Sequence, residues 1–367
     1  MIRAPGKLFI AGEYAVVEPG GSAVLVAVDR YVSVHVTPAE RRGTVHSAHY
    51  GRRPLRWERD ERAGVVPEPR ERPLDHVLSA IRTVEALVTD LGIVPRWHSL
   101  DITSELEDAD GRKYGLGSSA AVTVAVVRAL DQFYGLDLTA LEQFKVAMLA
   151  TVEVAASASG GDVAASTFGG WLAYHSPDRA AAAALRHREG VLAAMRAPWP
   201  LLQVTPLPAP SDLDLIVGWT GAAASTPALV ADVRDRRHTQ ELRYETFLAH
   251  SRARVQDLIT GLQQGDSAAV LAAVRAARDL LIGLGTGLGI EIETPALAHL
   301  VASAERIGAA GKPSGAGGGD CGIVLAARGS DLEPMLRDWE RSGVRRLPVA
   351  AAPMHERRGG AVRMIER

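Results

Sequence analysis

A lysine near the start of the chain lies where a glycine-containing loop enters an apolar segment, in Ala4-Pro5-Gly6-Lys7-Leu8. A lysine at such a point can reach a phosphate or a reacting hydroxyl, because its ammonium group is a compact charge on a flexible stem. The alternative is an ordinary surface lysine, the usual situation for this residue type. Lys7 is therefore a candidate catalytic and substrate-binding residue that needs support from other segments.

A second segment, Gly115-Leu116-Gly117-Ser118-Ser119-Ala120-Ala121, precedes an apolar stretch that we expect to be a buried helix. Glycines let the backbone approach a ligand, and the free amides at a helix start can face a pyrophosphate. The two serine hydroxyls could add a phosphate contact and a magnesium ligand. A helix cap made by Ser118 or Ser119 is the alternative that needs no ligand. The segment lacks the Gly-Lys-Ser/Thr ending of a Walker loop, and Ala120 replaces the third glycine of the dinucleotide fingerprint.

A single carboxylate lies among small residues in Ser157-Ala158-Ser159-Gly160-Gly161-Asp162-Val163. Burying such a carboxylate costs free energy unless it has a partner or a chemical role. Asp162 is therefore a candidate catalytic residue, and capping of the following helix is the alternative.

The densest run of glycines is Lys312-Pro313-Ser314-Gly315-Ala316-Gly317-Gly318-Gly319-Asp320. Three consecutive glycines predict a flexible loop that can close over a ligand, and a structural linker is the alternative. Residues 283–289 are also rich in glycine. They lack nearby charges and hydroxyl pairs, so we interpret them as a loop between helices.

Lysine is rare in this chain: of the 41 lysine and arginine residues, only Lys7, Lys113, Lys145 and Lys312 are lysines. Three of the four, all except Lys145, lie in or beside three of these glycine-containing segments. Since the chain uses arginine almost everywhere else, the retained lysines indicate sites where a compact point charge matters. Lys145 lies within an expected helix, and we expect it on a solvated face.

The totals exclude several classes of protein. The chain has 367 residues and a formal net charge of −2, so it lacks the dominant basic field that wholesale nucleic-acid binding needs. Apolar stretches are interrupted before about 18 residues, and residues 1–7 do not resemble a secretion signal. We therefore expect a cytoplasmic protein without a membrane span. Cys321 is the only cysteine, which excludes an intrachain disulfide.

Hydrophobic spacing predicts a mixture of strands and helices that would position these segments. We expect strands at 8–17, 22–36, 97–104, 171–174, 213–219 and 321–326, and helices at 74–91, 122–134, 138–154, 227–237, 239–262, 268–284, 294–307 and 332–341. Residues 40–73 are rich in arginine and proline, and we expect an exposed excursion with weak strands there. These elements predict an α+β protein of two domains, residues 1–175 and 176–367.

The glycine-containing segments resemble the three motifs of the GHMP kinase superfamily, which includes galactokinase, homoserine kinase, mevalonate kinase and phosphomevalonate kinase. The matching residues are 5–14, 115–121 and 312–322, in the family's order and at family-like spacing. Within the superfamily the chain looks most like the bacterial phosphomevalonate kinase family. Tyr14 follows Gly12-Glu13 at a place where mevalonate kinases tend to have histidine, and the sequence around Asp162 also differs from their pattern.

This resemblance implies a two-domain GHMP kinase fold, with a left-handed β-α-β unit in the N-terminal domain, a ferredoxin-like α/β C-terminal domain, and ATP and the acceptor in the cleft between them. It implies that residues 115–121 hold the ATP phosphates and that Ser118 or Ser119 binds Mg²⁺. Mevalonate kinases place a magnesium-binding glutamate eleven positions before the aspartate, where this chain has Thr151, and the nearest carboxylate is Glu153. The residues implied to act on the acceptor are Lys7, Tyr14, Lys113, Ser159, Ser225, Ser314, Gly315 and Gly317. Asp162 would orient Lys7 or act on the metal or the acceptor.

The implied reaction is the ATP-dependent phosphorylation of (R)-5-phosphomevalonate to (R)-5-diphosphomevalonate in the mevalonate route to isoprenoids. The acceptor is already anionic, so a strong general base is less necessary than a cation such as Lys7 that offsets the repulsion between two anions. One alternative is a mevalonate kinase, whose alcohol acceptor would give Asp162 a greater role as a base. Another is a catalytically idle member of the family that senses a ligand.

Overall fold

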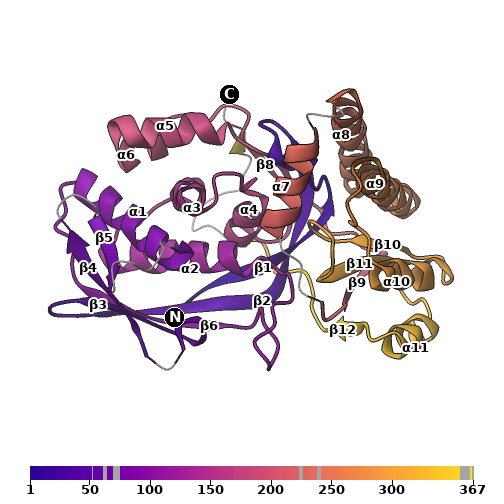
Figure 1. The fold of residues 1–367 in the computed structure, drawn as a ribbon, viewed down its shortest axis with the longest axis horizontal. Coiled ribbons are helices and arrows are strands. Elements are labelled where there is room, and N and C mark those ends of the chain that lie inside the picture. Colours follow the sequence, from indigo (N-terminus) through magenta and orange to yellow (C-terminus); the bar gives the residue numbers. More distant parts are fainter. Residues whose placement is uncertain are drawn as a thin grey trace.

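The computed structural model describes residues 1–51, 53–60, 64–68, 75–222, 226–237, 241–355 and 364–365. Within them the chain forms a nine-stranded sheet and a four-stranded sheet. Figure 1 shows the larger sheet and its helices on one side of the molecule and the smaller sheet with the later helices on the other. This arrangement confirms the predicted two-domain α+β architecture. None of the described helices has the length and apolar character needed to cross a membrane.

The larger sheet is organised around one long strand, β2 (Ser22–Pro38), whose first seven residues are all buried. Different parts of β2 pair antiparallel with β1 (Ile2–Ala11), β6 (His98–Ser104) and β7 (Trp171–His175). A strand buried in this way needs an apolar sequence, which residues 23–28 supply. The remaining strands extend the sheet at its two edges: β8 (Gln203–Leu207) and β13 (Met364–Ile365) at one, and β3 (Gly43–Ser47), β4 (Leu55–Asp60) and β5 (Gly64–Glu68) at the other.

Helices cover one face of this sheet (Figure 1). Helices α2 (Ser118–Tyr134) and α4 (Gly161–Phe168) pack on β1 and β2, and α1 (His76–Asp90) packs on α2 and α3 (Ala140–Val154). Side chains cap α1 and α3 at their N-termini. Asp75 accepts hydrogen bonds from two amides of α1, and Thr139 forms a capping box with Glu142 at α3. Two further helices, α5 (Arg179–Glu189) and α6 (Val191–Arg196), lie between β7 and β8 in the sequence.

The smaller sheet is antiparallel throughout, with β11 (Cys321–Ala327) and β9 (Leu213–Trp219) at its centre. Its outer strands are β10 (Ala310–Pro313) and β12 (Arg345–Leu347). Thr294 caps the helix that packs on β10 and β11, and proline occupies the first helical position, as the sequence predicts. The helices of this part are α7 (Thr226–Arg237), α8 (Glu241–Gln264), α9 (Ser267–Leu288), α10 (Pro295–Glu305) and α11 (Glu333–Arg341).

Three local predictions were wrong. The first strand ends at Ala11, and residues 15–17 form a short 3-10 helix, η1 (Ala15–Val17), instead of its continuation. Residues 283–289 do not form a loop, because α9 continues to Leu288. The described part of 40–73 contains strands, as predicted, but it is not an exposed excursion: β3, β4 and β5 extend the large sheet, and Trp57 is fully buried there.

The large sheet continues past the predicted domain boundary at residue 175. β8 pairs with β7 along residues 203–207, so this strand shares the hydrogen bonds of the N-terminal sheet. The next strand, β9, belongs to the smaller sheet. We therefore propose that the boundary between the domains lies between β8 and β9.

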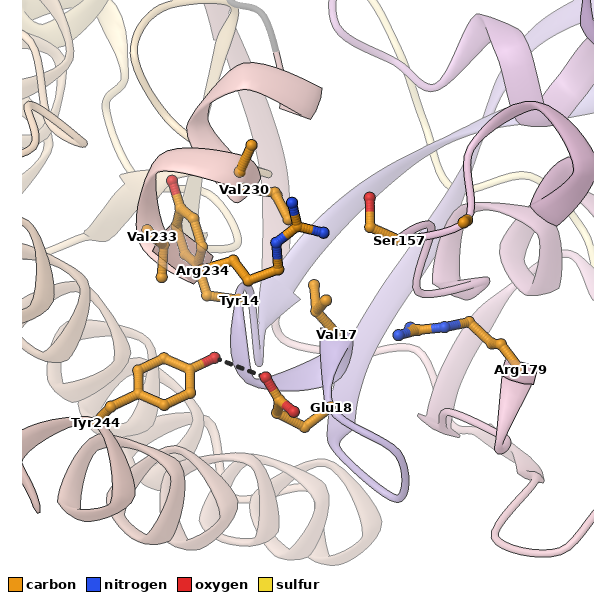
Figure 2. Close-up of a pocket in the computed structure, with 11 residues that line it drawn as sticks. Tyr14, Val17, Glu18, Ser157, Arg179, Val230, Val233, Arg234 and Tyr244 are labelled. Atoms are coloured by element: carbon orange, nitrogen blue, oxygen red, sulfur yellow. Dashed lines mark hydrogen bonds between the residues drawn. The ribbon is translucent and has the colours of Figure 1, made fainter. Parts of the chain in front are cut away.

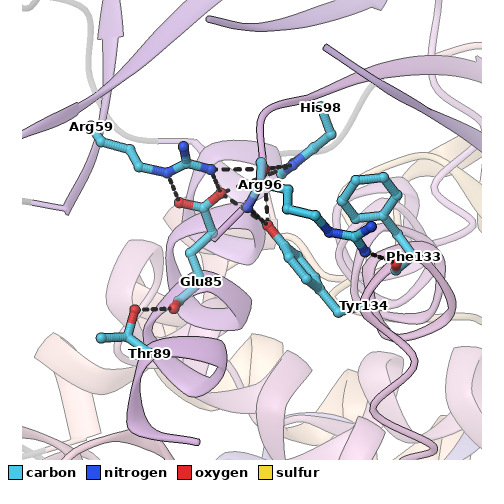
Figure 3. A network of polar contacts seen from close by, with 7 residues as sticks. All are labelled: Arg59, Glu85, Thr89, Arg96, His98, Phe133 and Tyr134. Atoms are coloured by element: carbon cyan, nitrogen blue, oxygen red, sulfur yellow. Dashed lines mark hydrogen bonds and ion pairs between the residues drawn. The ribbon is translucent and has the colours of Figure 1, made fainter. Parts of the chain in front are cut away.

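A polar network holds β4 against α1 at the edge of the large sheet (Figure 3). The Arg59 guanidinium donates two hydrogen bonds of 2.8 and 2.6 Å to the Glu85 carboxylate and lies 4.0 Å from the centre of the Trp97 ring. The Tyr134 hydroxyl donates to the same carboxylate at 3.4 Å. His98 is fully buried beside them, and its Nδ1 lies 3.1 Å from the carbonyl oxygen of Arg96. This pairing explains how an arginine-rich segment can form a strand that is held against a helix.

The burial of His98 predicts a pH-dependent stability. Burial lowers the pKa of His98 from 6.5 to about 4. The unfolded chain therefore binds an extra proton between these pH values, and lowering the pH favours unfolding. The free energy of unfolding should fall by roughly 2 kcal/mol more between pH 7 and pH 5 in the wild type than in His98→Phe, which keeps a ring at this position. Urea unfolding of both proteins at the two pH values measures this difference. Equal losses in both proteins would contradict the assignment to His98.

Candidate active site

Lys7 lies on β1 with its side chain 7% exposed and its ammonium group at the meeting point of several loops. Its Nζ is 3.6 Å from Oδ2 of Asp162 and 3.5 Å from the carbonyl oxygen of Gly115. The backbone amide of Lys7 donates a 2.9 Å hydrogen bond to Leu116. The sequence alternative of a surface lysine is therefore wrong, and the structure brings Lys7, Asp162 and the 115–117 loop together.

The start of α2 faces this lysine. Its N-cap residue is Gly117, with φ +77°, so neither Ser118 nor Ser119 caps the helix; they are its first two residues. A Cβ atom on Gly117 would lie 2.9 Å from Cε of Lys7 and 3.4 Å from Oδ2 of Asp162. Glycine is therefore required here by both backbone conformation and close approach. The first amides of α2 have no capping side chain, an arrangement that suits an anionic ligand.

Asp162 lies in the first turn of α4, and its side chain is 35% exposed. The N-cap residue of α4 is Gly160, so the capping interpretation of Asp162 is wrong. The carboxylate is partly solvated and partly paired with Lys7. It can therefore hold the ammonium group in place and still contact a ligand.

The third glycine-rich segment is packed against its neighbours, in contrast to the predicted flexible loop. Ser314 is buried, and its hydroxyl accepts from the amide of Phe9 at 2.9 Å and donates to the Phe9 carbonyl at 3.0 Å. A Cβ atom on Gly317 would lie 2.2 Å from the carbonyl oxygen of Ile292. A Cβ atom on Gly315 would lie 4.0 Å from Nζ of Lys7. The glycines therefore permit close packing, and the loop reaches the Lys7 ammonium group in this conformation.

A buried ion pair fixes the position of that loop. Lys312, on β10, is fully buried, and its Nζ contacts the carboxylate of Glu13 and donates to Pro313 O at 2.6 Å. Oε1 of Glu13 also accepts from the amide of Gly315 at 3.4 Å. Burial lowers the pKa of Lys312, while Glu13 acts in the opposite direction. The sequence predicts no role for Glu13, although a single acidic residue within the apolar segment 8–17 is a usable signal.

The other predicted acceptor residues lie at different depths. Tyr14 is buried at φ +62°, and its hydroxyl donates to the carbonyl of Ala316. Lys113 is exposed beside the 115–117 loop. Ser159 is half-buried, and its hydroxyl accepts from the amide of Gly161 at 3.3 Å. Ser225 lies outside the described residues.

Two polar residues of α3 have structural partners. Burial raises the pKa of Glu153, but Arg186, Ser79 and Arg82 more than offset this, so the pKa lies below its ordinary value. Glu153 is thus held in ion pairs of 3.0 Å with both arginines. The expectation that Lys145 lies on a solvated face was wrong: it is 2% exposed, and its Nζ donates to Ala197 at 2.8 Å.

Comparisons with known proteins agree with this geometry. Residues 76–170 match the family described as GHMP kinases N terminal domain, and residues 258–345 match GHMP kinases C terminal. A phosphomevalonate kinase from Streptomyces sp. strain CL190 is 45% identical over 361 residues, which cover 95% of this chain and 96% of that protein. A mevalonate kinase from Thermococcus gammatolerans is 29% identical, with 89% of each chain covered.

A solved structure of a phosphomevalonate kinase is also similar to this chain. Phosphomevalonate kinase from Streptococcus pneumoniae, in complex with phosphomevalonate and AMPPNP, superimposes with a TM-score of 0.82 at 27% identity. The similarity covers 95% of this chain and 99% of that protein.

The Glu13–Lys312 pair should be a strongly coupled stabilising unit. Lys312→Met leaves a buried carboxylate unpaired, so we expect a loss of about 3–5 kcal/mol in the free energy of unfolding. Glu13→Gln should also destabilise, whereas the double variant should recover a large part of the loss because no unpaired charge remains. Chemical unfolding of the three variants measures the coupling, with Lys113→Met as an exposed control. Additive losses in the double variant would show that the two residues act independently.

Proposed function

The chain belongs to the GHMP kinase family, and from this premise we propose that it transfers the γ-phosphoryl group of ATP to (R)-5-phosphomevalonate, giving ADP and (R)-5-diphosphomevalonate. The observation that carries the proposal is the position of the Lys7 ammonium group. It is buried, it lies 3.6 Å from a partly exposed carboxylate, and the uncapped start of α2 faces it. The 45% identity to a phosphomevalonate kinase over nearly the whole chain supports the choice of acceptor.

This arrangement suits a reaction between two anions. Phosphoryl transfer depends mainly on positioning and on neutralisation of charge. An oxygen of the acceptor phosphate forms a bond to the γ-phosphorus while the bond to the β–γ bridging oxygen breaks, and ADP leaves with the electron pair. The cation of Lys7 offsets the charge on the oxygens between the two reactants. The residues 115–121 hold the phosphates of ATP at the start of α2, where the helix dipole and the free amides favour an anion.

Asp162 acts on this reaction mainly through Lys7. The second pKa of a phosphate monoester is about 6, so most acceptor molecules are already fully deprotonated at neutral pH. Removing that proton is then not a requirement for Asp162. Its carboxylate holds the Lys7 ammonium group between the loops and faces the acceptor with its exposed part.

The residues present fit a magnesium ion bound together with the phosphates. Mg²⁺ prefers oxygen ligands and is usually held by one or two protein groups plus substrate phosphates. The hydroxyls of Ser118 and Ser119 begin α2 and would supply the protein ligand. In the described ranges no group of three or more His, Cys, Asp or Glu side chains is placed to hold a metal, so phosphate oxygens would complete the coordination. The bound ion would neutralise part of the phosphate charge.

The acceptor contacts come from both sides of Lys7. Gly315 places backbone beside the ammonium group, and Gly317 lets the same loop pack closely on Ile292. Tyr14 contacts this loop through Ala316, and Ser159 lies three positions before Asp162. Lys113 is exposed and can meet the acceptor phosphate as a mobile cation. Ser314 contributes by fixing its loop to β1, because its hydroxyl is engaged with Phe9 in both directions. Ser225 remains a proposed acceptor contact.

A comparison of three acceptors tests this function. ADP release should be fast with 5-phosphomevalonate and much slower with mevalonate or 5-diphosphomevalonate at equal concentration, because only the first brings a single terminal phosphate to Lys7. Faster turnover with mevalonate would identify a mevalonate kinase. ATP binding without turnover of any of the three would favour a ligand sensor.

Variants of the central pair test the mechanism. Lys7→Ala should lower kcat by about 10² or more with little change in ATP affinity, because its charge matters mainly in the transition state. Asp162→Asn should also lower kcat while the melting temperature stays near that of the wild type. The double variant should lose little beyond Lys7→Ala, since the two residues act as a unit. Additive rate losses, or a variant that only melts earlier, would contradict these roles.

A further inference from the structure

A pocket of ≈ 240 Å³ opens between η1, the loop before α4, the start of α5, and helices α7 and α8 (Figure 2). Two arginines line it, Arg179 from the first position of α5 and Arg234 from α7. Figure 2 shows their guanidinium groups extending toward the same space from opposite sides, with the Ser157 hydroxyl near that space. None of these three residues is among those that the chemistry at Lys7 uses.

Arg179 is placed where the fold alone does not favour a cation. It is the first residue of a helix, where the macrodipole opposes positive charge. Its Nη1 atom is buried and has no hydrogen-bond partner among the described residues. Burial lowers the pKa of Arg179, while Tyr174, Glu18 and Asp178 act in the opposite direction. A buried donor left without a partner costs free energy, so the described contacts of the fold do not fully satisfy this guanidinium group.

The lining defines the chemistry of such a ligand. The charged side chains that line the pocket are two arginines and Glu18, so positive charges outnumber negative ones in the lining. Arg234 also lies 3.5 Å from the carboxylate of Asp235, which is outside the lining, so Arg179 is the stronger candidate for a ligand. Glu18 is itself engaged, because its Oε1 accepts a 3.2 Å hydrogen bond from the hydroxyl of Tyr244. Valines from η1 and α7 make much of the remaining wall. The pocket therefore matches an anionic group carried on a short apolar chain.

The pocket lies next to the loops that form the reaction centre. Ser157 and Asp162 lie on the same short segment, five residues apart, which limits their separation to about 17 Å even if the chain were fully extended. Tyr14 lines the pocket, and its hydroxyl donates to Ala316. Ala316 follows Gly315, whose added Cβ atom would lie 4.0 Å from Nζ of Lys7. The same two loops thus border the pocket and the Lys7 ammonium group.

We propose that this pocket binds the carboxylate end of the acceptor, with Arg179 as the principal partner and Arg234 on the opposite side. The inference rests on the proposed function, which places the acceptor phosphate at Lys7. The site then recognises a molecule with an anion at each end and a short methyl-bearing chain between them. Arg179 and Arg234 are specificity-determining residues, and they take no part in the bond-making step.

The test compares two ligands that differ at the carboxylate end. 5-Phosphomevalonate carries this carboxylate, and 3-hydroxy-3-methylbutyl phosphate keeps the phosphate, the hydroxyl and the branched carbon chain without it. In Arg179→Met the Kd and KM for phosphomevalonate should rise about 10- to 100-fold, as expected when a charged hydrogen bond is lost. The Kd of 3-hydroxy-3-methylbutyl phosphate, measured by calorimetry, should change less than twofold, and kcat for phosphomevalonate at saturation should stay within a few-fold of the wild type. Arg234→Met should show the same pattern with a smaller effect.

Arg188→Met provides a matched control, because Arg188 lies on the same helix and, among the described residues, its ion pair is an exposed contact of 3.8 Å with Glu189. It should leave both ligands unaffected. Equal weakening of the two ligands in Arg179→Met, or weakening of neither, would overturn the carboxylate assignment. If the wild type fails to bind or turn over phosphomevalonate, the proposed function fails instead, so the two failures are distinguishable. A melting temperature for Arg179→Met equal to or above that of the wild type would support a ligand-binding role, because removing an arginine that stabilises the fold would lower the melting temperature.

Discussion

The buried contact between Lys312 and Glu13 is the constraint on which the catalytic geometry depends. A fully buried ammonium group is very costly unless a carboxylate neutralises it and further acceptors satisfy its hydrogens. Glu13 follows β1 of the large sheet, whereas Lys312 lies on β10 of the small one, so satisfying the charge fixes the two sheets against each other. The same carboxylate accepts from the Gly315 amide, which places the third glycine-rich loop beside Lys7. One electrostatic requirement therefore sets both the domain contact and the shape of the site.

The rarity of lysine has a physical explanation that differs from the one suggested by sequence. Lys7, Lys145 and Lys312 are all buried, and Lys145 lies in none of the glycine-containing segments. An ammonium group has three donors, whereas a guanidinium has five in a rigid fork, so burying arginine requires more acceptors. Arg128 shows this, because its burial uses Gln143 and the carbonyls of Arg3 and Thr167. Lysine thus occurs chiefly at buried positions where few acceptors are available. A phosphate-binding role is proposed for Lys7 and not for Lys145 or Lys312.

The sequence predicted the local chemistry better than the long-range packing. The motif residues Lys7 and Asp162 were identified, and they do meet, although 155 positions separate them. The end of β1 was misplaced because apolar residues continue through 15–17, while the chain turns at Tyr14 with φ +62°. The strands within 43–68 were undervalued because their charges are paired across the fold, as in Arg59 with Glu85. Glycines at 315–319 suggested mobility, but their contacts with Ile292 and Ala222 show that absence of a side chain also serves close packing.

The separation of cations within the site bears on how the acceptor is chosen. Lys312 is paired directly with Glu13, so it adds little positive potential to the site. Lys7 is 3.6 Å from the carboxylate of Asp162, which is partly exposed to solvent. Lys7 therefore keeps attraction for a phosphate even in a chain of net charge −2. Arg179 and Arg234 place a second positive region across the 156–162 and 314–316 loops. An acceptor with one anionic end satisfies only one of these regions, and the other must then stay hydrated or unpaired at a cost. Recognition of two anions at a fixed spacing thus gives selectivity without any contact to the transferring atoms.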